Sequence, residues 1–285
     1  MHDIGSDLRA SSAMAAANAA TAAGMAAAAV LCVLCGATGL PAVLAASSAG
    51  AYIALSAAVW LLSPKGRRSG WLGLSRLRLA DVAAGTAAML LAYPTMIAVA
   101  ALSAVLVPSS TLEIGDATSA AMSGMPALVR ALAFAAFPAF GEELLCRGMV
   151  YSAARRYGRA WGIVLPAACF AAMHGNVQQM SYAFLCGLLL SAIRDGSGSL
   201  WPCVAAHFAF NAISAVPAGG APAIPAAALL LSPFLACGTV VLALSTYKRN
   251  TDLARDTEPS RGSPVVFSAM LGLGTLVAIL SGRLL

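Results

Sequence analysis

Two adjacent carboxylates stand inside a long apolar stretch of this sequence. Glu142 and Glu143 lie within the apolar segment 127–150, and Arg147 follows Glu143 by four residues. Ionisable groups are costly in the middle of a membrane-spanning helix, and they usually mark a functional site. Their presence in one short stretch therefore indicates chemistry rather than membrane anchoring alone.

The two glutamates cannot share one role, because neighbouring residues of a helix point about 100° apart. The four-residue separation places Glu143 and Arg147 on one face, in the order that favours an ion pair. Such a pair would offset part of the cost of burying both charges. Our first interpretation of Glu143 and Arg147 is therefore structural.

Glu142 points in another direction, near the middle of the same expected span. Burial disfavours the charged form of an unpaired carboxylate, which suits such a group to take a proton from water. Two other interpretations stay open, namely a structural ion network between helices and a proton or ion pathway in a transporter. We predict a catalytic role for Glu142.

Two histidines fall in later apolar segments. His174 ends the run Phe170-Ala171-Ala172-Met173-His174, and His207 precedes Asn211 by four residues. That spacing places His207 and Asn211 one turn apart on a single helix face. Two aligned donors could stabilise a developing oxyanion, although an interhelical polar clamp would use the same residues. Together with Glu142, they favour a hydrolytic site.

The elements that must position these residues are membrane helices. The 285-residue chain is 60% hydrophobic and 10% charged, with a mean hydropathy of +0.83. These values exclude a soluble globular domain and predict an all-α fold, a polytopic integral membrane bundle of about eight or nine transmembrane helices. The expected spans are 14–36, 41–63, 80–107, 126–153, 160–175, 179–194, 199–216, 222–246 and 265–282. The first is rich in alanine and is also compatible with an interfacial helix or a signal anchor.

Cations follow every second expected span, and Lys and Arg favour the cytoplasmic side of short loops. The loop between the third and fourth spans carries Glu113 and Asp116 and no cation. This pattern predicts a multi-pass protein integral to the cell membrane, with its N-terminus in the cytoplasm and its C-terminus outside. The net charge of +6 is then explained by contact with the lipid bilayer, and no nucleic acid partner is implied. The cations are Lys65, Arg67, Arg68, Arg76, Arg78, Arg155, Arg156, Arg159, Arg194, Lys248, Arg249, Arg255 and Arg261.

The seven cysteines all lie in apolar segments, where thiols behave as small hydrophobes. They do not suggest a disulfide framework. Cys32 and Cys35 form a C-x-x-C pair, but no histidine lies nearby to support a redox or metal site.

Three motifs occur in order along the chain: E-E-x-x-x-R, then F-x-x-x-H, then H-x-x-x-N. This series resembles the CAAX prenyl endopeptidase and bacteriocin-processing enzymes, the CPBP intramembrane proteases. The resemblance covers roughly residues 126–216. We therefore expect three parts: N-terminal transmembrane helices without a motif over 1–125, a catalytic helical core over 126–216 and C-terminal transmembrane helices over 217–285.

The resemblance implies a multi-helix intramembrane endopeptidase of a family long called metalloproteases. Glu142 would activate the attacking water with His174, while His207 and Asn211 would stabilise the tetrahedral oxyanion. Glu143 and Arg147 occupy the remaining motif positions, in agreement with the ion pair expected from their spacing. The implied partner is a membrane-associated protein or peptide, either a CAAX-type substrate or a leader-type peptide.

A zinc ion is one alternative for this site. Glu142, His174 and His207 would be acceptable ligands with an open position for water, and Glu143 would then serve as the base. The H-E-x-x-H helix of common zinc peptidases is absent, however. A metal-free glutamate and histidine mechanism uses the same residues. We favour no cofactor and keep zinc as the alternative.

Other intramembrane protease classes fit the sequence less well. The aspartyl class needs two aspartates within the membrane, whereas Asp81 and Asp195 lie at span ends. The stretch Gly196-Ser197-Gly198-Ser199 resembles a serine nucleophile loop, but we expect a flexible connector there.

Two further interpretations do not require peptidase chemistry. A non-enzymatic membrane scaffold or bacteriocin-immunity protein would keep its effect when Glu142 and His174 are replaced, whereas a peptidase would not. A proton-coupled transporter would show a flux that depends on pH and no cleavage product.

Overall fold

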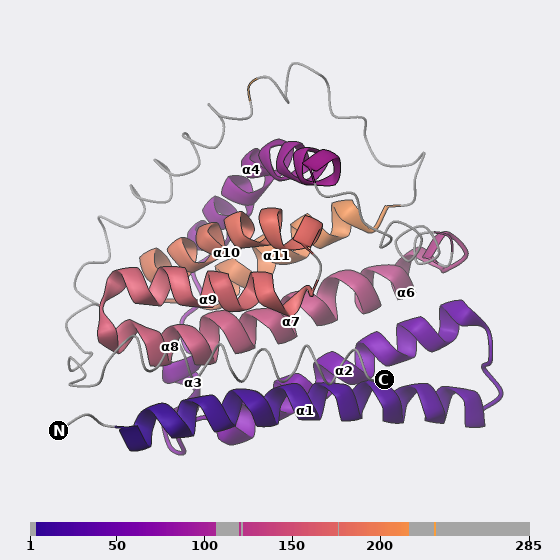
Figure 1. Cartoon of the computed structure of the whole chain (residues 1–285), viewed down its shortest axis with the longest axis horizontal. Coiled ribbons are helices and arrows are strands. Elements are labelled where there is room, and N and C mark those ends of the chain that lie inside the picture. The colour runs from indigo at the N-terminus through magenta and orange to yellow at the C-terminus, as the bar shows by residue number, and fades with distance from the viewer. Residues whose placement is uncertain (1–3, 107–119, 121, 176, 217–230, 232–285) are drawn as a thin grey trace.

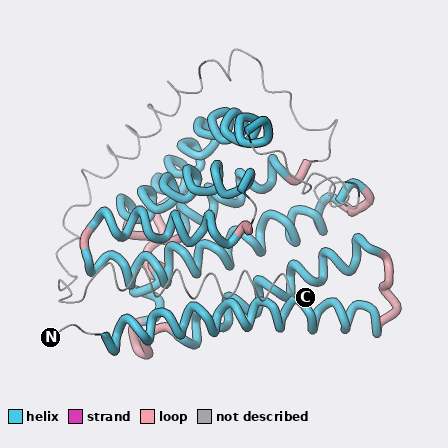
Figure 2. Tube along the Cα trace, viewed as in Figure 1, coloured by secondary structure: helices cyan, strands magenta, loops and turns pink. Residues whose placement is uncertain are grey.

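The computed structural model of the chain describes residues 4–106, 120, 122–175, 177–216 and 231. Its described part consists of helices and loops without a strand, which confirms the all-α fold class (Figure 2). The expected spans 222–246 and 265–282, and with them the expected C-terminal part 217–285, lie outside the described residues apart from 231.

The helices occur in the following order: α1 (Ile4–Leu34), α2 (Leu40–Leu62), α3 (Arg68–Leu72), α4 (Leu79–Leu106), α6 (Ala127–Ala131), η1 (Leu132–Ala136), α7 (Phe137–Glu143), η2 (Leu144–Val150), α8 (Tyr151–Ala154), η3 (Arg155–Tyr157), α9 (Arg159–Met173), α10 (Val177–Ser197) and α11 (Trp201–Ser214). In the described part of the chain, three helices are long and apolar enough to cross a membrane, at Ser12–Leu34, Leu40–Leu62 and Leu79–Leu106. The larger expected number of spans stays a prediction.

Helices α1 and α2 form an antiparallel hairpin that lies as a layer beside the other helices (Figure 1). Gly24 and Gly50 face each other where the two helices cross, and a Cβ atom on either would collide with the backbone of the other. Small residues allow apolar helices in membranes to approach this closely.

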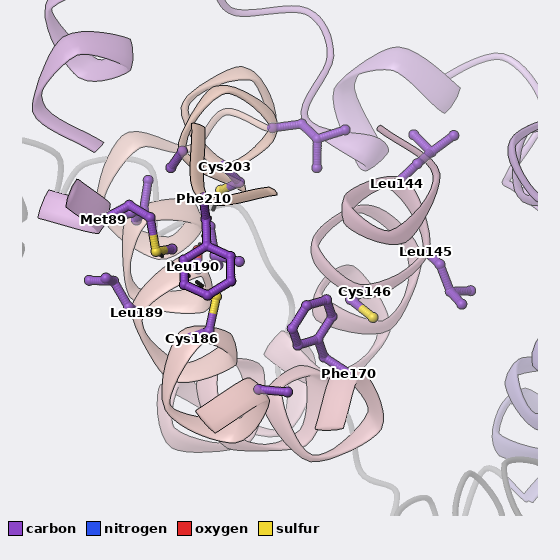
Figure 3. Close-up of a cluster of buried hydrophobic side chains, with 14 of the residues drawn as sticks. Met89, Leu144, Leu145, Cys146, Phe170, Cys186, Leu189, Leu190, Cys203 and Phe210 are labelled. Carbon is purple, nitrogen blue, oxygen red and sulfur yellow. Dashed lines mark hydrogen bonds between the residues drawn. The ribbon is translucent and has the colours of Figure 1, made fainter. Parts of the chain in front are cut away.

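A second layer holds α9, α10 and α11, with α4 packed against α10 and α11 (Figure 1). The core between these helices is apolar and contains thiols. Cys186 and Phe210 lie on one side of it and Cys146 on the other, and Phe170 is directed into the space between them (Figure 3).

The segment from residue 127 onward, expected as one span, is a helix of alternating geometry. Two π-helical segments, η1 and η2, flank the short α-helix α7. Pro138 is near the start of α7 and has no N–H to donate to the preceding turn, which fits a change of helix type there. The π geometry is frequent at functional sites, and here it brackets the segment that ends in Glu142 and Glu143.

The connector at 196–199 is ordered, so our expectation of a flexible segment is wrong. Ser199 is fully buried and its hydroxyl donates to the carbonyl of Arg76. The Ser197 hydroxyl donates to the carbonyl of Ile193 at 2.7 Å. Buried hydroxyl groups need partners, and nearby backbone carbonyls supply them here. The connector is thereby fixed against the loop that precedes α4.

The nearly buried carboxylate of Asp195, in the last turn of α10, forms hydrogen bonds with residues in and around η3. The Asp195 side chain is 2% exposed and accepts hydrogen bonds from Tyr151 Oη at 2.8 Å, Arg155 Nε at 2.9 Å and Arg159 Nε at 2.8 Å. Charge-assisted bonds to a buried acceptor are stronger than bonds between neutral groups. Asp195 therefore stabilises the packing of α8, η3 and α9 on α10.

We expect Asp195→Ala to lower the free energy of unfolding by about 3 kcal/mol, because three donors lose their acceptor at once. Thermal unfolding of the purified protein in detergent measures this loss. Arg159→Ala is the matched control: its side chain is 39% exposed, and removing it should cost less than about 1 kcal/mol. Equal losses in the two variants would contradict the central role of Asp195.

Candidate active site

A fully buried ion pair lies at the centre of the site. Arg147 Nη1 donates to Glu143 Oε1 at 2.9 Å, and neither side chain is exposed. The ion pair predicted from the four-residue spacing is thus present. Arg147 Nη2 also donates to the carbonyl of Gly187 at 2.9 Å, and its guanidinium lies 4.6 Å from the ring centroid of Phe170. The ion pair consequently connects η2 with both α9 and α10.

His207 on α11 lies between the two glutamates. Its Nδ1 is 2.9 Å from Glu143 Oε1, and its Nε2 is 3.8 Å from Glu142 Oε2. The Glu143 carboxylate, paired with Arg147, only accepts hydrogen bonds. In its contact with Glu143 Oε1, Nδ1 of His207 is therefore the donor. The longer contact exceeds hydrogen-bonding distance but is one that a water molecule can bridge.

Glu142 stays outside the ion pair, as the angle between neighbouring helical residues requires. Its side chain is 12% exposed. Glu142 Oε1 accepts a hydrogen bond from Tyr52 Oη at 2.5 Å, while Oε2 is the oxygen that faces His207. Among the described residues, no Lys or Arg nitrogen comes within 4.0 Å of Glu142. This carboxylate is thus the one that remains available to a reacting molecule.

His174 directly follows α9 and is half-buried. Its Nδ1 lies 2.8 Å from the carbonyl oxygen of Phe170. A carbonyl only accepts, so Nδ1 bears the hydrogen and Nε2 of the neutral ring presents a lone pair. His174 has no contact within 4.0 Å with Glu142 among the described residues, so their predicted partnership stays a prediction.

The ring of Phe170 lies between the two imidazoles. Its centroid is 5.0 Å from that of His174 and 5.3 Å from that of His207, edge-on in both cases. The F-x-x-x-H motif therefore contributes a spacer as well as a histidine. Sequence reasoning assigned no role to this phenylalanine.

Asn211 lies one turn beyond His207 on α11 and is half-buried. Within the described part of the chain, its side-chain amide has no hydrogen bond to another residue. The amide is therefore available to a bound molecule on the side of α11 that His207 occupies. Its predicted oxyanion role stays a prediction.

Tyr52 is the site residue that sequence reasoning missed. It belongs to α2, which carries none of the three motifs. A tyrosine in the middle of an apolar helix is a signal in itself, because a buried phenol hydroxyl usually has a hydrogen-bond partner. Which partner it has depends on how α2 packs on α7, and the sequence alone does not predict that contact.

The residues predicted as zinc ligands are not arranged as a ligand group. No three His, Cys, Asp or Glu side chains come together to hold a metal ion within the described ranges. Glu142 and His174 stay apart, and Nδ1 of His207 is already bonded to Glu143. As placed, these donors do not fit a zinc ion.

Comparison with known proteins gives one family match. Residues 124–213 match the family model described as type II CAAX prenyl endopeptidase Rce1-like. The matched segment covers about a third of the chain and contains all three motifs. No curated protein and no solved structure gave a match. The family match and the long apolar helices identify a membrane protein. The resemblance predicted from the motifs is therefore confirmed: over residues 124–213 this chain is similar to the family of CAAX-type endopeptidases that this model describes.

Proposed function

We propose that this protein is an intramembrane endopeptidase that hydrolyses a peptide bond in a membrane-associated substrate. One observation carries the proposal: Glu142 is free of the Glu143–Arg147 ion pair and presents an oxygen 3.8 Å from His207 Nε2. A carboxylate beside an imidazole in a site of low exposure is an arrangement suited to activating water. The family description, which names an endopeptidase, supports the same reaction class.

In the proposed reaction, Glu142 Oε2 takes a proton from a water molecule. The water oxygen then attacks the carbonyl carbon of the scissile peptide bond, and the carbonyl oxygen becomes negatively charged. Glu142 is suited to this step because no Lys or Arg of the described residues neutralises it within 4.0 Å. General base catalysis of this kind contributes about 10²- to 10⁴-fold to a rate.

His207 and Asn211 are proposed to stabilise the oxyanion. Because Nδ1 of His207 donates to Glu143, its Nε2 donates only in the doubly protonated ring. In that form the ring N–H and the Asn211 amide would both serve the oxyanion from one face of α11.

His174 is proposed to assist proton transfer from the far side of Phe170. The Phe170 carbonyl holds the hydrogen on Nδ1, so Nε2 of the neutral ring accepts a proton. A group in that form is able to receive the second proton of the attacking water. It would then donate this proton to the amine nitrogen as the carbon–nitrogen bond breaks and the oxyanion re-forms a carbonyl group.

The proposed substrate is a CAAX-type or leader-type peptide that approaches from the bilayer, with no nucleic acid partner. We also propose a multi-pass topology with the N-terminus in the cytoplasm. The start of α1, α3 and α8 lie toward one end of the structure (Figure 1). Lys65 precedes α3, Arg155 follows α8, and the Arg194 side chain packs against Gly73 at the end of α3. Clustering of cations at one end agrees with the preference of Lys and Arg for the cytoplasmic face.

We expect Glu142→Gln to abolish hydrolysis while the protein stays folded, because the amide has the size of the carboxylate but does not take a proton. The measurement is cleavage of a lipidated CAAX peptide and of a library of membrane-associated peptides by purified protein in detergent. Wild-type turnover by Glu142→Gln would contradict the mechanism. A well-folded wild-type protein that cleaves none of these peptides would instead favour the scaffold interpretation.

Glu143→Ala is expected to act mainly on stability. Removing this fully buried carboxylate leaves Arg147 and His207 without their shared acceptor, which should cost about 3 kcal/mol or more. Thermal unfolding in detergent measures the loss, and Glu142→Ala serves as the neighbouring control with a much smaller effect. Equal destabilisation by the two variants would show that the glutamates share one structural role.

We expect cleavage to continue when divalent metal ions are chelated, because the proposed steps use only side chains. The test compares turnover before and after incubation with a strong zinc chelator, with unfolding temperature recorded in parallel. Loss of activity at unchanged stability, reversed by added zinc, would restore the zinc alternative with Glu142, His174 and His207 as ligands.

A further inference from the structure

Tyr52 reaches the site from outside the segment that matches the family. It lies on α2, while the match covers 124–213. Its hydroxyl donates to Glu142 Oε1 at 2.5 Å. A distance this short is typical of an O–H group that donates to an ionised carboxylate.

The residue before Glu142 allows this contact. Gly141 is buried, and a Cβ atom at that position would lie 2.9 Å from Cδ1 and 3.2 Å from Cβ of Tyr52. The tyrosine ring thus occupies the space that a side chain on Gly141 would need. Because the ring packs directly on the α7 backbone, its hydroxyl extends to the neighbouring carboxylate.

A second hydrogen bond fixes the position of α2 along the same segment. Ser48 lies one turn before Tyr52, and its hydroxyl donates to the carbonyl of Ala133 at 2.6 Å. Ala133 belongs to the π-helical segment η1 that precedes α7. Two consecutive turns of α2 are therefore bonded to the part of the chain that carries Glu142, and Tyr52 is positioned by the fold rather than by its own side-chain preference.

The two oxygens of Glu142 consequently have different surroundings. Oε1 is occupied by Tyr52, and Oε2 faces Nε2 of His207. Glu143, the other titratable neighbour on α7, is bonded to Arg147 and His207. A carboxylate held at one oxygen cannot rotate freely, so its second oxygen stays directed at the place where water would react.

We propose that Tyr52 is a positioning residue for Glu142: the phenol hydroxyl holds one carboxylate oxygen so that the other serves as the base. This inference rests on the proposed endopeptidase function and assigns α2 a part in it.

The test is the variant Tyr52→Phe, which keeps the ring on Gly141 and removes only the hydroxyl. We expect kcat to fall about 10- to 100-fold with KM changed less than about threefold, because orientation of the base is lost while substrate contacts are kept.

Tyr93→Phe is the matched control. Tyr93 is also half-buried in a membrane helix, its ring packs on Phe210 at 5.3 Å, and its hydroxyl has no bond to Glu142, Glu143 or His207. The kcat, the KM and the unfolding temperature of this variant should match those of the wild type. Unfolding temperatures of Tyr52→Phe, Glu142→Gln and the double variant provide an independent measure, in which the double variant should lose less than the sum of the two single losses.

Three results would count against the inference. If the wild type cleaves and Tyr52→Phe has the same kcat and KM as Tyr93→Phe, the positioning role is overturned while the proposed function stands. A lower kcat without coupling between Tyr52→Phe and Glu142→Gln in the unfolding temperatures would reduce Tyr52 to a structural contact. Failure of the folded wild type to cleave would overturn the proposed function itself.

Discussion

Burial of one carboxylate constrains the rest of this structure. Glu143 has no exposed surface, and a carboxylate removed from water is stable only when donors surround it. Arg147 and His207 supply those donors from η2 and α11, and Arg147 also bonds to α10. The ion pair therefore determines how closely these three elements approach one another. Phe170 completes the arrangement by covering the guanidinium with its ring.

The same constraint gives the two neighbouring glutamates different surroundings. Glu143 is paired with Arg147 and His207. Glu142, the next residue along the helix, is directed toward a different side of α7. Tyr52 and His207 then meet Glu142 at its two oxygens. The Glu142 carboxylate thus lies beside a buried ion cluster, and His207 contacts both.

Contacts within one helix were the part of the site that the sequence could predict. The Glu143–Arg147 pair follows from a four-residue separation, and the shared face of His207 and Asn211 follows from the same rule. The position of His207 between two glutamates depends on how α11 packs against α7, for which the spacing carries no information. The contact of Tyr52 with Glu142 is a packing result of the same kind.

Our expectation for residues 196–199 failed for a related reason. Gly and Ser are typical of flexible connectors, but the hydroxyl groups of Ser197 and Ser199 are buried against backbone carbonyls. Composition describes the preferences of an isolated segment. In the folded chain, the loop before α4 supplies a carbonyl acceptor that fixes the position of Ser199.

Because π-helical segments lie on either side of α7, the number of residues in this region affects the direction of its side chains. Each residue added to or removed from an α-helix turns everything beyond it by about 100°. A π turn holds one additional residue and so resets the direction in which the following side chains point. The carbonyl of Ala133 is fixed by its hydrogen bond from Ser48. Ala133 lies in η1, so part of this π-helical segment separates it from Glu142. The number of residues between Ala133 and Glu142, more than their identity, therefore decides which side of the bundle the Glu142 carboxylate faces. Relatives of this chain should tolerate exchange of the apolar residues of η1 more readily than a change in their number.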